Sequence, residues 1–203
     1  MRDWRPEHPP GPVFGSDPER GAVKPGDGLR PPDPPLTDAV VSLRPLAVTD
    51  MARVEAALGD PEICRWFDNR GVTAREVVER AVARWRAGEA AEFAVLDAGD
   101  CVGSLWLTLG ADSRATVGYW LLQAARGKGL AAHALALVSR WGFDELGVKR
   151  IGLLADPRNV ASLRVAERAG FQREGVLRSW VDVNGERVDH VSFSLLPTES
   201  RVL

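Results

Sequence analysis

The chain has 203 residues, of which 45% are hydrophobic and 27% are charged, and its formal net charge at pH 7 is −2. This composition is typical of one globular domain, and it excludes the strong positive field with which many proteins hold nucleic acid. No apolar run approaches the roughly 18 residues of a membrane span, so we expect neither a nucleic-acid partner nor a membrane.

The N-terminal segment differs in composition from the rest of the chain. Residues 1–39 hold ten of the fourteen prolines and five of the glycines, with few apolar residues. Such a segment buries too little surface to offset the entropy lost when it is ordered. We therefore expect a disordered Pro/Gly-rich arm over 1–39 and a single folded domain over 40–203.

Helical segments come early in the folded part. The run VVSLRPL reads as a first strand, and Thr49 or Asp50 caps the helix that follows it. A second short helix is EICRWF. Thr73 and Glu76 have the spacing of a capping box, which opens a third helix.

Strands dominate the remainder of the chain. EFAVLD, CVGSLWLTLG and TVGYWLL are separated by turns, which predicts three sequential antiparallel strands. A helix then ends at Gly147, KRIGLLA reads as a buried strand, and a helix over 160–169 is closed by Gly170. QREGVLRSWVDV and RVDHVSFSLL form a terminal hairpin around an Asn-Gly turn.

The segment RGKGLA, residues 126–131, places two glycines between a strand and a helix. Glycines let backbone N–H groups approach an anion closely, and a helix N-terminus adds partial positive charge, so the loop is a candidate phosphate cradle. It fits neither a Walker loop, because Leu130 follows Gly129, nor a Rossmann fingerprint, which needs glycine at Ala132. Taken alone, the loop is equally compatible with a purely structural turn.

A second strand-to-helix junction, DPRNVASLRVAERAGF, follows some thirty residues later. With it, the chain resembles the GCN5-related N-acetyltransferases, whose R/Q-x-x-G-x-G/A signature has Arg126, Gly129 and Ala131 at its marked positions. The run NVASLRVAERAGF followed by EGVLR is similar to the RimJ/RimL branch, which acetylates protein N-termini or small amines. The resemblance covers about residues 40–196.

This resemblance implies an α/β (α+β) fold with a mixed, mostly antiparallel sheet flanked by helices. Its fourth and fifth strands, TVGYWLL and KRIGLLA, are expected to splay apart and admit acetyl-CoA, whose pantetheine behaves like an added strand. A bulge near Leu121 and Leu122 is expected to present a backbone N–H that stabilises an oxyanion.

The resemblance also implies which residues bind the cofactor. Arg126 and Lys128 are expected to add cationic contacts to the phosphates, Asn159 to bind the pantetheine amides, and Ser162 to point at the sulfur. The pyrophosphate is expected to rest on the amides of Gly127, Lys128, Gly129, Leu130 and Ala131.

Two catalytic positions depart from the family pattern. The tyrosine with which many members protonate the leaving thiolate is replaced by Ala166, and a serine at the position of Ser162 can take its place in the RimJ/RimL branch. The alternative for Ser162 is a capping or packing role. The glutamate base of part of the branch corresponds to Val181, and the neighbouring Asp182 faces the other side of the strand unless a bulge intervenes.

The general base is therefore unassigned, and this favours an acceptor of low pKa. At pH 7, deprotonation costs roughly 1 kcal/mol for an α-amine and about 4.6 kcal/mol for a lysine side chain. We expect an α-amine or another low-pKa amine as the acceptor.

The remaining candidates concern the acceptor pocket and metals. Trp66, Trp106 and Trp180 either line an aromatic acceptor pocket or belong to the core. His133 and His190 are interpreted as surface residues. Three histidines and two distant cysteines have no ligand spacing, so the sequence predicts no metal site, no disulfide framework and a cytoplasmic compartment.

These observations predict an N-acetyltransferase that moves acetyl from acetyl-CoA directly to a primary amine. The acceptor is either a protein N-terminus or a small-molecule amine such as an amino acid derivative or antibiotic. The alternative is a non-catalytic module with the same fold that binds CoA or a partner. The sequence favours neither a monomer nor a homodimer.

Overall fold

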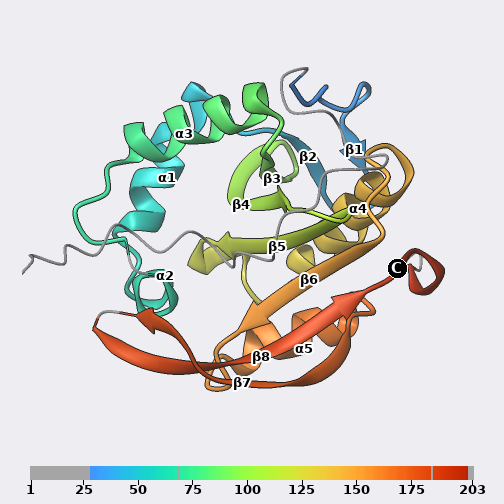
Figure 1. Ribbon diagram of the computed structural model, residues 1–203. Helices are drawn as coiled ribbons and strands as arrows, with labels where there is room; N and C mark the ends of the chain where they lie inside the picture. Colours follow the sequence, from blue (N-terminus) through green and yellow to red (C-terminus); the bar gives the residue numbers. More distant parts are fainter. Residues whose placement is uncertain (1–27, 68, 184, 201–203) are drawn as a thin grey trace, which may run out of the picture.

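The computed structural model describes residues 28–67, 69–183 and 185–200, and its centre is a single twisted sheet (Figure 1). The strand order is β1-β2-β3-β4-β5-β6-β8-β7, and β5 and β6 form the one parallel pair in this sheet. The expected mixed, mostly antiparallel sheet is confirmed. Its strands are β1 (Leu36–Thr37), β2 (Ser42–Pro45), β3 (Ala90–Asp97), β4 (Asp100–Leu109), β5 (Arg114–Leu121), β6 (Arg150–Ala155), β7 (Gln172–Val183) and β8 (Glu186–Leu195).

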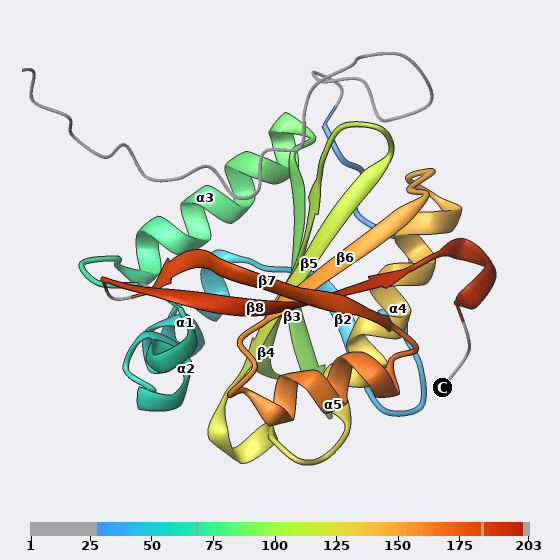
Figure 2. The same ribbon diagram turned by 60° about the horizontal axis from the view of Figure 1, so that its bottom comes forward.

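Helices lie on both sides of the sheet. Figure 2 shows α1, α2 and α3 together on the left and α4 on the right, with α5 below the crossing strands β7 and β8. No helix of the described ranges is both long and apolar enough to span a bilayer. The helices are α1 (Met51–Leu58), α2 (Pro61–Trp66), α3 (Ala74–Ala87), α4 (Leu130–Asp144) and α5 (Val160–Arg168), with short 3-10 turns at Val48–Asp50, Gln123–Ala125 and Pro197–Glu199.

Local sequence signals account for several helix starts. The capping box that opens α3 is confirmed, because Thr73 Oγ1 accepts the Glu76 N–H and the Glu76 carboxylate accepts the Thr73 N–H. Asp60 caps α2, where its Oδ1 accepts the N–H groups of Glu62 and Ile63 at 2.9 and 3.3 Å.

Two apolar clusters fill the space between the sheet and the helices. The larger one packs α4 and α5 against the sheet, and in it the rings of Trp85, Phe93 and Trp141 meet at centroid distances of 5.3 to 6.1 Å. The smaller one packs α1 and α3 against the other face through residues such as Val54 and Val78. Helix α3 contributes to both clusters, with Val78 in the smaller one and Trp85 in the larger one.

The packed domain begins earlier than the expected boundary at Val40. Leu29 is only 7% exposed and its N–H donates to the Trp85 carbonyl at 2.9 Å, while Leu36 pairs with Leu43 in the sheet. These two leucines pack residues 28–39 against the domain, which the high proline content of this segment did not predict. Residues 1–27 of the expected arm lie outside the described residues.

The parallel pair β5 and β6 separates part of the way along. Pairing runs from Arg114 opposite Arg150 to Val117 opposite Leu153 and then stops, although β5 continues to Leu121. The expected splay between these strands is confirmed. It leaves backbone groups at the carboxyl end of β5 without a partner strand on that side.

Candidate active site

The splay opens into a groove of about 730 Å³. Its walls come from the carboxyl ends of β5 and β6, from α2, from α5, and from the loop that begins α4. Residues on its surface include Glu62, Trp66, Phe67, Trp106, Gly118, Tyr119, Trp120, Leu121, Arg126, Gly127, Gly129, Leu130, Ala131, Leu154, Asp156, Asn159, Ser162, Arg168 and His190.

The end of β5 directs the backbone N–H of Leu121 toward this groove. The Leu122 N–H donates to the Val102 carbonyl at 2.9 Å, so it is already used by β4. Because hydrogen-bonded and non-hydrogen-bonded pairs alternate along an antiparallel ladder, Leu121, opposite Gly103, directs its N–H away from β4 and toward the splay. The register between β4 and β5 is unbroken through these residues, so the expected bulge is absent. Of the two candidate donors, only Leu121 fits.

The loop before α4 has the backbone geometry of an anion cradle. Gly127 and Gly129 have φ of 77° and 85°, a region that favours glycine, and Gly129 is the N-cap of α4. The N–H groups of the first helical turn have no intrahelical acceptor, and those of Leu130 and Ala131 belong to this turn. All four residues line the groove.

The cation over this loop is one that sequence reasoning missed. A Cβ on Gly129 would lie 3.7 Å from the guanidinium carbon of Arg168, the last residue of α5. By contrast, the Lys128 Nζ lies 3.4 Å from the Asp97 carboxylate and Lys128 does not line the groove. Arg168 therefore lies over the loop, whereas Lys128 is directed toward Asp97, and the position of Arg168 depends on the packing of α5 against the loop.

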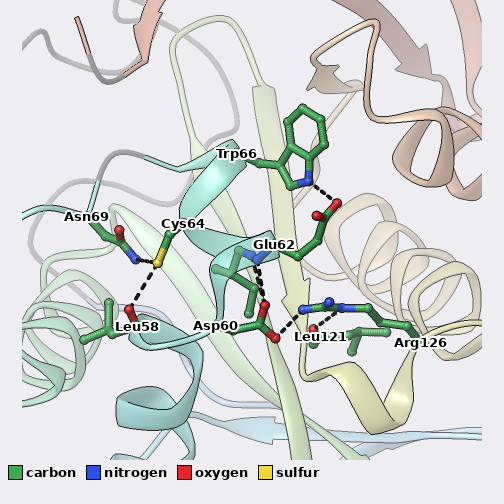
Figure 3. Close-up of polar contacts among 9 residues, drawn as sticks. Leu58, Asp60, Glu62, Cys64, Trp66, Asn69, Leu121 and Arg126 are labelled. Atoms are coloured by element: carbon green, nitrogen blue, oxygen red, sulfur yellow. Dashed lines mark hydrogen bonds and ion pairs between the residues drawn. The ribbon is translucent and has the colours of Figure 1, made fainter.

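Arg126 makes two contacts that the sequence did not predict. Figure 3 shows its guanidinium between Asp60 and the end of β5, where Nη2 donates to Asp60 at 2.6 Å and Nε donates to the Leu121 carbonyl at 2.9 Å. Since Asp60 also caps α2, this contact ties α2 to the strand whose N–H faces the splay. Arg126 lines the groove, and its charge is paired with Asp60 in this structure.

Two hydroxyl groups meet on the α5 side of the splay. The Tyr119 hydroxyl donates to Ser162 Oγ at 3.1 Å, and the Ser162 N–H donates to the Asn159 Oδ1 at 3.0 Å as the N-cap contact of α5. Burial raises the pKa of Tyr119 to about 12, so this phenol is protonated at neutral pH. Asn159 lines the groove as expected, but its carbonyl oxygen is committed to the helix.

Sequence reasoning missed Tyr119, the one tyrosine in the chain. The family position for a tyrosine lies on α5 and holds the fully buried Ala166 here. The hydroxyl instead arrives from β5, 43 residues before Ser162. The sequence did contain one signal: in the strand TVGYWLL, Tyr119 is two residues before Leu121, so both side chains lie on the same face of the sheet.

Aromatic rings form the wall opposite α5. The rings of Phe67 and Trp106 meet edge to face at 5.8 Å, and the Trp66 Nε1–H donates to Glu62 at 2.9 Å. A Cβ on Gly118 would lie 2.4 to 2.9 Å from atoms of the Trp106 indole, so only glycine lets this indole lie on β5.

Two of the expected acceptor residues lie elsewhere. Trp180, on β7, is 37% exposed and does not line the groove. Asp182 accepts the Gly185 N–H at 2.8 Å at the end of the hairpin and does not line it either. The irregular register of β7 between Leu177 and Val181 does not bring this carboxylate inward.

Comparison with known proteins agrees with this geometry. The family model described as "Acetyltransferase (GNAT) domain" matches residues 41–172. The probable N-acetyltransferase YjcK of Bacillus subtilis (strain 168) is 42% identical over 87 residues, covering 43% of this chain and 48% of YjcK, so the match spans about half of that protein. The uncharacterized N-acetyltransferase p20 of Bacillus licheniformis is 26% identical over 167 residues, covering 78% and 94%. The structure of Mycobacterium smegmatis RimJ in complex with CoA-disulfide has a TM-score of 0.73 at 27% identity, covering 87% and 91%.

Proposed function

Because this chain belongs to the acetyltransferase (GNAT) domain family, we propose that it transfers acetyl from acetyl-CoA directly to a primary amine. The observation that carries the proposal is the splay between β5 and β6, which has an anion cradle at one end and the Tyr119–Ser162 hydroxyl pair beside it. The similar RimJ structure is a complex with CoA-disulfide, which supports a coenzyme A ligand here.

The residues around the splay fit acetyl-CoA as a ligand, which supplies the acetyl group as a thioester. The unpaired edge of β5 can hydrogen-bond an extended chain, as in strand addition. The amides from Gly127 to Ala131 and the guanidinium of Arg168 can hold phosphate oxygens at the start of α4.

Three groups of the chain are suited to the transfer itself. The Leu121 N–H is fixed by its strand and can donate to a carbonyl oxygen on which negative charge develops, a contribution of about 3 kcal/mol in comparable sites. The Ser162 hydroxyl can give its proton to a leaving thiolate and is itself held by the Tyr119 hydroxyl. No covalent acetyl-enzyme is needed, since neither Cys64 nor Cys101 lines the groove.

We propose an α-amine, of a protein N-terminus or a small molecule, as the acceptor, because no carboxylate base occupies the strand position where the family has glutamate. A cytoplasmic location is part of the same proposal and is supported by two unpaired cysteines.

The test is thiol release from acetyl-CoA with three acceptors: peptides with a free N-terminus and no lysine, N-terminally blocked peptides with one lysine, and free amino acids. We expect the free α-amines to react about 200-fold faster at pH 7, in line with their neutral fractions. Faster reaction of the lysine side chain contradicts the acceptor class. Tight CoA binding without turnover for any amine contradicts the transfer and favours a non-catalytic module.

The substitution Gly118→Ala tests the aromatic wall. The added methyl overlaps the Trp106 indole, so we expect the indole to move and kcat/KM for the amine to fall about tenfold, while the Kd for CoA changes little. Gly152→Ala is the matched control, because its Cβ would meet no atom closer than 3.8 Å on the neighbouring strand. Equal kinetic losses in the two variants would contradict a role for the wall in acceptor binding.

A further inference from the structure

His190 of β8 is a half-buried residue without an assigned role. Its Nδ1 is fully buried and has no hydrogen-bond partner of acceptable geometry among the described residues. Unpartnered buried polar atoms are rare and costly, so each one calls for an explanation, and a catalytic role is one of them. His190 also lines the groove, so its ring borders the space where substrates would meet.

The register of the sheet places His190 on the acceptor face. Ala155 of β6 pairs with Val191, and Val117 of β5 pairs with Leu153, so His190 shares side-chain parity with Leu154 and Gly118. Gly118 is the residue against which the Trp106 indole lies. His190 and the aromatic wall therefore lie on one face of the sheet.

The hydroxyl pair lies on the opposite face. Tyr119 follows Gly118 along β5 and directs its side chain to the other side, where it reaches Ser162 on α5. A reaction centre in the splay would thus have the imidazole on one side and two hydroxyls on the other. Acetyl transfer needs a proton acceptor for the attacking amine and a proton donor for the leaving thiolate, and this arrangement provides one on each side.

His190 also lies at the right level along the strands. Continuing the parallel register two residues beyond Val117 and Leu153 brings Tyr119 level with Ala155. Because Ala155 pairs with Val191, the neighbouring His190 lies one step further along, beside the carboxyl end of β5. The Leu121 N–H that faces the splay belongs to that same end.

The surroundings keep the imidazole neutral. Burial lowers the pKa of His190 below its ordinary value, and the charge of Asp156 together with the backbone and the charge of Asp189 oppose this shift without cancelling it. Both carboxylates are engaged elsewhere, Asp156 by the guanidinium of Arg158 and Asp189 by the Ser179 N–H. The other titratable groups on the groove are Glu62, Tyr119, Arg126, Arg164 and Arg168.

We propose that His190 is the proton acceptor for the amine, and that it selects acceptors of the α-amine class. This inference rests on the proposed acetyl transfer. His190 takes one proton from the acceptor's ammonium group and later releases it to water. The freed nitrogen lone pair forms the N–C bond, and the C–S bond breaks with its electrons on sulfur, which takes the proton of the Ser162 hydroxyl. The second amine proton passes to water, and water returns a proton to Ser162.

The selectivity follows from the strength of the base. An imidazole is a weak base, and an α-amine of pKa about 8 gives up its proton roughly 250 times more readily than a lysine side chain of pKa about 10.4. A site whose base is a neutral histidine therefore suits α-amines, whereas a lysine acceptor would need a stronger base.

The test compares His190→Gln with the wild type across pH, with a lysine-free peptide that has a free N-terminus as the acceptor. We expect kcat/KM for the peptide to fall about 100-fold near pH 6.5 and to recover to within about threefold near pH 9.5, where the amine is already neutral. The Kd for CoA, measured by calorimetry, is expected to be unchanged, which shows that the variant is folded.

A second variant and a control make the result specific. His190→Ala is expected to regain activity near pH 6.5 when free imidazole is added. His133→Gln is expected to behave as wild type, because His133 lies on α4, bonded to Asp38, and does not line the groove.

A loss in His190→Gln that is equal at both pH values, or no loss at all, overturns the role of His190 and leaves the acetyl transfer standing. Absence of turnover in the wild type with every amine overturns both.

Discussion

Replacing Ser162 with alanine is expected to lower kcat about 100-fold and to leave the Kd for CoA within about threefold of the wild-type value. The hydroxyl lies beside the splay and receives a hydrogen bond from Tyr119, so its removal takes away the nearest proton source for a leaving thiolate. The helix start survives, because the N-cap contact at this position uses the backbone N–H of Ser162 rather than its hydroxyl.

Tyr119→Phe is expected to lower kcat by a smaller factor, about tenfold, since the phenol acts through Ser162. The double variant then loses little more than Ser162→Ala alone, because the two groups form one hydrogen-bonded unit. Additive losses would indicate that Tyr119 acts independently. Steady-state thiol release at saturating amine measures kcat in each variant.

Ser139→Ala is the control for the loss of a serine hydroxyl. Ser139 lies on α4, is fully buried, and its Oγ has no partner within the described residues, so its replacement should leave kcat unchanged. If Ser162→Ala retains wild-type kcat, the serine has only a packing role and the proton for the thiolate comes from elsewhere.

The sequence predicted the features that depend on interactions between residues close together in the chain. The capping box at Thr73, the two glycines of the RGKGLA loop and the sequential antiparallel pairing of β3, β4 and β5 depend on residues close together in the chain, and each is present in the structure. The splay was expected from family resemblance, and the end of pairing at Val117 matches it.

The chemistry of the site depends on contacts between distant segments. The Tyr119 hydroxyl donates to Ser162 from another element. Arg168, at the end of α5, lies close to Gly129, and Arg126 pairs with Asp60. Periodicity cannot reveal which of several cations reaches an anion cradle, because that depends on how α5 and α2 dock on the sheet.

His190 is a residue that the sequence placed on the surface and that contacts between distant segments bring to the groove. An isolated histidine in an alternating strand reads as a surface residue, and one of its neighbours in sequence, Asp189, is indeed exposed. Only the pairing of β8 with β6 shows that the imidazole borders the groove with a buried, unpartnered nitrogen.

The largest stability effect is expected from Arg44→Ala. Arg44 donates to both carboxylate oxygens of Asp50, at 2.7 and 2.8 Å, and Asp50 is only 3% exposed. Removing the guanidinium leaves a buried carboxylate with the Ala47 N–H at 3.0 Å as its remaining backbone donor. Arg44 itself is partly exposed, so we place the loss at the lower end of the range for broken buried pairs, about 3 kcal/mol.

For a domain of this size such a loss corresponds to a fall in Tm of about 10 °C, measured by thermal unfolding at pH 7. Arg75→Ala, which removes the surface pair between Arg75 and Glu79, is the control and should leave Tm almost unchanged, because both side chains are well exposed. Equal Tm values for the Arg44 variant and the wild type would show that the buried pair contributes nothing net.

The dependence of this loss on pH identifies its electrostatic origin. Burial alone would raise the pKa of Asp50, but the hydrogen bonds from Arg44 and Ala47 outweigh it and hold the pKa below its ordinary value. A carboxyl whose pKa is lower in the folded than in the unfolded protein stabilises the fold above its unfolded pKa, and this contribution disappears as pH falls through the folded pKa. Without Arg44, protonation of the buried Asp50 carboxyl stabilises the folded protein instead. The Tm difference between wild type and Arg44→Ala should therefore shrink on acidification, whereas a difference that stays constant with pH would point to lost packing of the arginine stem.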